Sequence, residues 1–408
     1  MSPISQSASE DHRLRIPTVF TAGFRFYFLA AGLFSVFAMV AWNIWLGVYA
    51  AGGKLVAIPM SMAPHLWHAH EMMFGYTIAV IAGFFVTAVP NWTGTKEAGA
   101  KFVMLSGSVW MLGRLAIWFS GLLDPILVAV LDLAFIPILS TAIIGRLAQK
   151  SQARNMVFLA LLSALFAGNL LMHLDWMGWA DGTAEIGVRL GILTSAAMIV
   201  IIGGRVVPAF TRNALNRQGY KGSLPQSYAW LDRACILLAL LTALASLPFI
   251  PDPVLGAICL TAGLANLVRL SCWKGLATLG NPIVWILHAS FLLLCAGYLA
   301  LGIAILFDIL SATAALHLIA VGAVGSMTLA MMTRASLGHS GHPLTVSGAI
   351  VAAYLFVIAA ALIRALGALY WDYYLVMLVS GAFWILGFGL FSIVFFPILT
   401  QPRPALPR

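Results

Sequence analysis

The sequence predicts an all-α membrane protein in which twelve helices cross the lipid bilayer. Of its 408 residues, 62% are hydrophobic and only 9% are charged, and the mean hydropathy is +0.99. A soluble globular protein of this size does not tolerate so apolar a surface in water. The apolar runs are continuous rather than alternating, which favours helices over a β-barrel, because a spanning helix satisfies its own backbone polar groups.

Twelve apolar stretches are long enough to cross, since a hydrocarbon core of about 30 Å needs roughly 20 helical residues. They are 23–49, 65–90, 101–121, 124–147, 154–174, 184–208, 228–250, 253–271, 281–306, 312–333, 346–369 and 373–397. The first follows a polar stretch without a small-residue cleavage site, so we interpret it as an uncleaved span. No polar stretch is long enough for a soluble domain, which leaves one transmembrane domain, 23–397, between tails at 1–22 and 398–408.

A short, similar sequence recurs at the ends of three of these spans and divides the twelve into groups. VPNWT at 89–93, VPAFT at 207–211 and the MMTRAS run around Thr333 each close a span, and the three spans are four helices apart. This spacing predicts three units of four helices each.

The basic residues predict the orientation, because short loops rich in Lys and Arg stay on the cytoplasmic side. They precede the first span and follow the even-numbered spans: Arg13, Arg15, Lys96, Lys101, Arg146, Lys150, Arg154, Arg212, Arg217, Lys221, Lys274, Arg334, Arg403 and Arg408. We therefore expect both termini in the cytoplasm. The residues behind the net charge of +9 lie in these loops, where they set the orientation of the spans. The charge therefore does not indicate a nucleic-acid partner.

Ionisable side chains inside the spans are the candidates for chemistry, because a charge at the bilayer centre costs several kcal/mol and is usually kept for function. Residues 65–73 read HLWHAHEMM, so three histidines and a glutamate open the second span. Side chains of four other spans are expected at the same depth, namely Arg114, Asp132, His173 and His317. His288 lies closer to the cytoplasm, and His339 and His342 fall in the loop after the tenth span.

Helical geometry separates the histidines of the second span. At about 100° per residue, His65 and His68 lie on nearly one face, whereas His70 points about 200° away from His68. One metal ion is therefore not held by both members of the HxH pair on a regular helix. Either the first turn is unwound, which would let His65 assist, or the pair faces two centres. Glu71 is placed to orient an imidazole or to carry a proton.

Imidazole binds zinc, copper and iron, including the iron of haem, for which a helix bundle supplies an apolar slot. The four cysteines lie singly and form no CxxC pair, so no thiolate metal site is indicated. Twelve spans with an intramembrane histidine and glutamate also suit a proton-coupled transporter. A visible haem absorption band would separate these two classes of protein.

Four segments resemble the signature of the NnrS family: HAHEMMFGYTIAVIAGFFVTAVPNWTG at 68–94, GGRVVPAFTRN at 203–213, NPIVWILH at 281–288 and ALHLIAVGAVGSMTLAMMTRASLGHSG at 315–341. The resemblance implies a bacterial inner-membrane protein that holds haem and copper and acts in denitrification and in protection against nitric oxide. The residues that match the family pattern are His68, His70, Glu71, Asn91, Arg205, His288, His317, Arg334 and His339. One departure is His342, where the pattern has an arginine.

These observations lead to a set of expected site residues. We expect one or two haem b groups and copper, with Glu71 and Arg114 in the chemistry. The expected cofactor ligands are His68, His70, His317, His288 and His173, and the expected metal ligands are His65, His68, His70, His317 and His339. One histidine of the HxH pair, with His317 as the leading partner, would form a bis-imidazole haem while the other turns to copper or a second haem. Haem-copper oxidases, in which an HxH pair faces two haems, are an analogy of arrangement only.

The expected partners are nitric oxide, a quinol or other electron donor, and the lipid bilayer. Three functions stay open at this level: redox conversion of nitric oxide, haem-based sensing or assembly without turnover, and proton-coupled transport. Consumption of nitric oxide by the purified, reduced protein would exclude sensing without turnover.

Overall fold

The computed structural model describes residues 16–55, 58–149 and 153–404, and every regular element in these ranges is helical. The long elements are α1 (Gly23–Ala50), α2 (Pro64–His70), α3 (Ile78–Thr93), α4 (Ala100–Trp118), α5 (Pro125–Leu133), α6 (Phe135–Gln149), α7 (Ala153–Trp176), α8 (Thr183–Arg217), α9 (Ala229–Ala245), α10 (Asp252–Ser271), α11 (Pro282–Phe307), α12 (Ala312–His317), α13 (Ser326–His339), α14 (Gly348–Leu366) and α15 (Tyr373–Thr400). Two π-helical segments, η2 (Glu71–Thr77) and η4 (Leu318–Gly325), join α2 to α3 and α12 to α13. Short 3₁₀ turns are η1 (Thr18–Phe20), η3 (Gly275–Thr278) and η5 (Gly367–Leu369).

The prediction of an all-α polytopic protein is confirmed. Within the described residues, eleven continuous helical segments are long and apolar enough to cross a membrane. The remaining expected span, 228–250, corresponds to α9, which has only 17 residues. The sixth span is longer than expected, because α8 continues through Pro208 to Arg217 as a polar helical extension. Arg13, Arg15, Lys150 and Arg408, used for the orientation, lie outside the described residues, as do parts of both predicted tails.

Three spans form the centre of the bundle. Residues Pro64–Thr93 and Thr183–Arg217 have 78% of their most apolar window buried and Ala312–His339 has 67%, against 33–56% in the other spans. These are the second, sixth and tenth expected spans, and they are the same three spans that end in the recurring short sequence. The predicted four-helix spacing thus places one central helix in each group, although the internal repeat itself stays a prediction.

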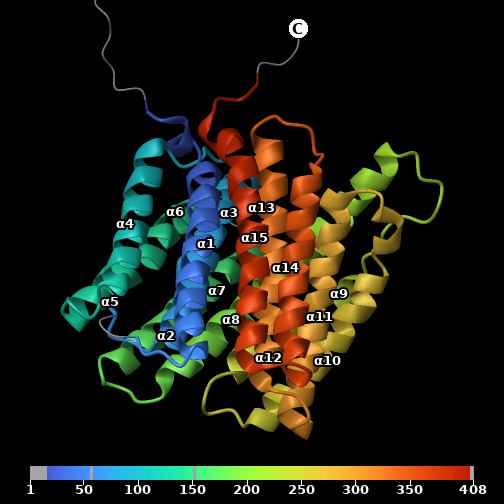
Figure 1. Ribbon diagram of the computed structural model, residues 1–408. Helices are drawn as coiled ribbons and strands as arrows, with labels where there is room; N and C mark the ends of the chain where they lie inside the picture. The colour runs from blue at the N-terminus through green and yellow to red at the C-terminus, as the bar shows by residue number, and fades with distance from the viewer. Residues whose placement is uncertain (1–15, 56–57, 150–152, 405–408) are drawn as a thin grey trace, which may run out of the picture.

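The two ends of the described chain lie side by side at one end of the bundle (Figure 1). A guanidinium nitrogen of Arg25, near the start of α1, donates to the carbonyl oxygens of Ile398 at 2.9 Å and Gln401 at 2.8 Å. The helices α1 and α15 pack along each other below this contact (Figure 1). Both described ends are therefore on one side of the membrane domain, and that this side is cytoplasmic stays a prediction.

The π-helical segments follow the histidines of the second and tenth spans directly. In η2 the hydroxyl of Thr77 donates to the carbonyl oxygen of Met72, five residues earlier, at 2.8 Å. Gly75 lies at a close approach, because a Cβ there would be 2.6 Å from the ring of Phe34 and 2.9 Å from a guanidinium nitrogen of Arg114. Single π turns inside α-helices occur frequently at functional sites. Each π turn contains more residues per turn than an α-helix. The side chains after it therefore point in directions that a regular helix would not give them relative to the histidine before it.

Helix α5 ends beside a buried acid because of a proline. Pro137 has no N–H to bond the carbonyl of Leu133, and the helix is interrupted at Ala134 before α6 begins. Asp132 lies in the last turn before this break and is 3% exposed. The position of this break therefore determines where the Asp132 carboxylate lies among the other helices.

The backbones of α7 and α8 touch at two glycines. A Cβ at Gly187 would collide with the carbonyl oxygen of Gly168, and Phe74 from η2 packs at the same place. Small residues permit such close approach of membrane helices. Because α7 carries Asn169 and His173, this contact also sets the position of two buried polar side chains.

We predict that Gly187→Ala lowers the thermal stability of the purified protein, because the added methyl group meets backbone that has no room to move. Overpacking of this kind costs about 1–3 kcal/mol. The matched control is Gly145→Ala on α6, where a Cβ would meet no atom within 4 Å. A thermal melt in detergent measures both variants, and equal melting temperatures for the two would contradict the close contact.

Candidate cofactor site

A cavity of about 670 Å³ opens at the end of the bundle away from the described chain ends. Its walls come from α1, α2, η2, α8, α10, α11, α12, η4, α14 and α15, and Figure 1 shows α2 and α12 at this end. Cofactor and ligand sites commonly have volumes of about 300–1,000 Å³. The cavity therefore has room for a large planar group.

Three histidines line this cavity, His65 and His68 on α2 and His317 on α12. The Nδ1 of His317 lies 2.7 Å from the carbonyl oxygen of Thr313. A carbonyl only accepts hydrogen bonds, so Nδ1 carries the proton and the lone pair of Nε2 is free to bind a metal. His68 stacks on Trp42 with ring centroids 4.8 Å apart and an interplanar angle of 14°. Its Nδ1 is buried without a partner, and its Nε2 makes no hydrogen bond among the described residues, so Nε2 is the ring nitrogen open to the cavity.

The cavity changes in polarity along its length. Charged and polar side chains gather around its mouth, and these are His65, Glu185, Arg189, Asp252, Arg364 and Tyr373. The deeper wall is mostly apolar and includes Met39, Met73, Ile192, Val324 and Trp384. Arg364 lies close enough to both His68 and His317 to interact with them electrostatically. Such a gradient suits a ligand with an apolar body and an anionic edge.

A second group of polar side chains is enclosed in the bundle beside the cavity. We call it the acid cluster; its members are His70, Glu71, Arg114, Asp132, Asn169 and His173, none of them more than 5% exposed. They come from α2, η2, α4, α5 and α7. Five elements thus bring their polar groups together where water is excluded.

Asp132 is the centre of the acid cluster. Its Oδ2 lies 2.8 Å from Asn169 Nδ2, 2.9 Å from His173 Nε2 and 3.2 Å from His70 Nε2. Arg114 forms an ion pair with the other oxygen of Asp132 and a second ion pair with Glu71. The Nδ1 of His70 lies 2.8 Å from Glu71 Oε1, so both nitrogens of this ring face oxygen atoms.

The charges of the acid cluster do not balance on their own. Two carboxylates and one guanidinium leave one negative charge if both imidazoles are neutral. An unbalanced charge away from water is costly, so the cluster is suited to take up a cation. That cation is either a proton on an imidazole or a metal ion. His70, Asp132 and His173 each offer one ligand atom, and these atoms lie within 4.8 Å of one another. Two imidazoles and a carboxylate suit copper, iron or zinc.

The two histidines of the HxH pair therefore belong to two different sites, the cavity and the acid cluster. His68 faces the cavity and His70 faces the acid cluster, because α2 is regular from Pro64 to His70 and irregular only afterwards. His65 is exposed at the mouth of the cavity on the face of His68. The first turn is thus not unwound, and His65 does not reach the acid cluster.

His288 and His339 line neither the cavity nor the acid cluster. The Nε2 of His288 lies 2.8 Å from the hydroxyl of Thr211, which itself donates to the carbonyl oxygen of Val207. The Nδ1 of His288 is buried and has no partner among the described residues. The ring of His339 packs 5.5 Å from that of Phe24, measured between centroids. No hydrogen bond or ring contact in the described ranges joins His288 to His339.

Three neighbours of the site were not identified from the sequence. Asn169 lies four residues before His173 on the same face of α7, and this spacing in an apolar helix is a signal that would have found it. Trp42, which stacks on His68, is on a helix without any polar motif. Arg364, near the end of α14, lines the cavity.

Comparison with known proteins gives one match and one negative result. The family model described as NnrS protein matches residues 18–403, which is nearly the whole chain. No curated protein matches this chain.

We predict that Arg114→Gln strongly destabilises the protein, because Glu71 and Asp132 lose the guanidinium that pairs with both of them. Removing one member of a buried ion pair costs about 3–5 kcal/mol. The control is Arg189→Gln, whose bond to Asp252 is partly exposed and contributes no more than about 1 kcal/mol. Thermal melts of both variants measure the difference. A similar small effect at the two positions would contradict the buried network.

Proposed function

The chain belongs to the NnrS family, and on that premise we propose that it holds haem and copper within the membrane and acts in nitric oxide metabolism. Family membership supports a membrane protein related to nitric oxide in general. The finer proposal concerns the cofactors, the residues that bind them and the inner-membrane location. It rests on the side chains that line the cavity and the acid cluster.

One observation carries the haem proposal: His68 and His317 reach a single cavity of about 670 Å³ from two different helices. Nε2 of each ring is free of hydrogen bonds among the described residues, as a ligand to haem iron requires. The apolar deep wall suits the body of a porphyrin. Arg364 at the mouth suits its carboxylate side chains, because arginine pairs well with carboxylates.

The copper proposal places the ion among His70, Asp132 and His173. Bound copper would balance the excess negative charge of the acid cluster, and Asn169 would hold the carboxylate through its amide at 2.8 Å. Outer partners of this kind orient metal ligands and tune their basicity. Glu71 contacts His70 from the other side and keeps that ring in place.

The two cofactors would supply one-electron chemistry, and nitric oxide would bind the reduced haem by displacing one of its two imidazoles. The chain would supply position and protons. Reduction of nitric oxide consumes protons as well as electrons. Glu71 and His70 are placed to hold a proton beside the cavity, since they share a hydrogen bond of 2.8 Å and His70 is two residues from His68. Arg114 fixes Glu71 and Asp132 for this role through its two ion pairs. Electrons would come from a quinol or another donor in the membrane.

A proton-coupled transporter is the rival proposal, because a cavity open at one end of a twelve-span bundle also suits a carrier. The histidine tautomer favours the haem, since a proton carrier has no need of a fixed Nε2 lone pair at His317. An intense visible absorption band in the purified protein distinguishes the two. A colourless protein would favour the carrier.

We predict that single substitutions separate the two cofactors. His68→Ala and His317→Ala lower the haem content and keep copper, whereas His70→Ala and His173→Ala lower the copper content and keep haem. Pyridine haemochrome assays and elemental analysis of the purified variants count both. The control is His342→Ala, in the loop after α13, which changes neither. Identical losses in the His68 and His70 variants would contradict two separate sites.

A further inference from the structure

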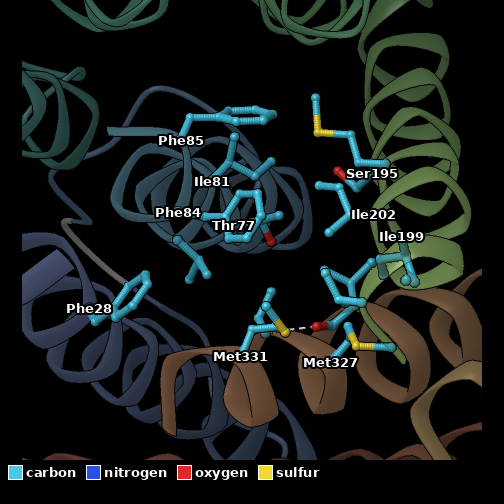
Figure 2. Close-up of a pocket in the computed structure, with 16 residues that line it drawn as sticks. Phe28, Thr77, Ile81, Phe84, Phe85, Ser195, Ile199, Ile202, Met327 and Met331 are labelled. Carbon is cyan, nitrogen blue, oxygen red and sulfur yellow. Dashed lines mark hydrogen bonds between the residues drawn. The ribbon is translucent and has the colours of Figure 1, made fainter. Parts of the chain in front are cut away.

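A smaller pocket of about 80 Å³ lies between helices α1, α3, α8 and α13 (Figure 2). Its walls are side chains of α1, α3, α8 and α13 together with the ends of both π segments. The labelled side chains of Figure 2 that face it include Phe28, Ile81, Phe84, Ile202, Met327 and Met331. No lysine, arginine, histidine, aspartate or glutamate lines it.

The pocket and the cavity share part of their walls. Thr77 and Val324 line both of them, and these residues lie at the ends of η2 and η4. Beside this junction the hydroxyl of Tyr76, from the cavity, bonds the hydroxyl of Thr328, from the pocket. We call the junction formed by Thr77 and Val324 the neck. The two π turns therefore end at a wall that the pocket and the cavity share.

One polar group of the pocket wall lacks a partner. Ser195 on α8 is 3% exposed, and its hydroxyl makes no hydrogen bond among the described residues. A serine within a helix commonly bonds a carbonyl oxygen three or four residues earlier, but this one does not. Figure 2 shows its oxygen turned toward the pocket. It thus presents a single donor to anything that enters an otherwise apolar space.

We infer that this pocket holds a neutral diatomic gas of the nitric oxide class and delivers it through the neck to the cavity. The inference deepens the proposed function and rests on it. Small apolar cavities stay free of water and take up apolar guests such as xenon. A charged product such as nitrite would lose its hydration there without a partner, so the pocket discriminates against ions. The space is too small for a porphyrin or a lipid chain, and without a titratable group it does not carry protons.

The first test uses xenon as an apolar probe on crystals of the full-length protein. Xenon under pressure is expected to give an anomalous peak between Ile81 and Ile202, and Ile81→Phe or Ile202→Phe is expected to remove it. The two variants fill the pocket from different helices, so one that fails to fold leaves the other available. The control is Leu237→Phe, at a lipid-facing position of α9 that is 57% exposed. Absence of xenon from the pocket of the unmodified protein would overturn the inference.

The second test measures delivery. After photolysis of the nitric oxide complex of the reduced protein, Ile202→Phe is expected to slow bimolecular rebinding several-fold at unchanged haem content, and Leu237→Phe is expected to leave it unchanged. Xenon in the pocket together with an unaltered rebinding rate would overturn the delivery role. The xenon result does not depend on haem. A failure of the proposed cofactor site therefore remains distinguishable from a failure of this pocket.

Discussion

Arg114 pairs with two carboxylates inside the membrane, and much of the arrangement around the site depends on that contact. Glu71 follows the HxH pair on the second span, and Asp132 closes α5 before its proline-induced break. By binding both acids, the guanidinium connects the second, third and fourth spans. The acids in turn contact His70 and His173. Arg114 thus connects the helix packing to the position of both imidazoles.

The division of the HxH pair depends on how the second span is wound. The regular α2 turns His68 and His70 to different sides, and the π turn that follows brings Glu71, Gly75 and Thr77 to the positions where they act. Glu71 reaches Arg114, Gly75 gives that guanidinium room, and Thr77 lines the neck. The tenth span repeats the pattern, because a π turn follows His317 and ends at the neck. Two irregular turns in central helices therefore set both cofactor geometry and access.

Most of the fold could be predicted from the sequence, because long apolar runs leave a chain few alternatives in a bilayer. The all-α polytopic class and the opposite directions of His68 and His70 follow from composition and helical period. The π turns and the break at Ala134 could not be predicted, since they depend on packing against other helices. The grouping of Arg114 and Asp132 with His70 was indicated only as a shared depth. Which residues meet at that depth depends on the order of helices around the bundle, and hydropathy does not contain that information.

The central claim is that one haem is held between His68 and His317. Electron paramagnetic resonance of the oxidised, purified protein tests it most directly, because the spectrum of ferric haem reports its axial ligands. The account predicts a low-spin signal of a haem with two imidazole ligands, and conversion to a high-spin or haem-free spectrum in both His68→Ala and His317→Ala. The absence of any haem signal in the unmodified protein, or an unchanged low-spin signal in the two variants, would contradict it.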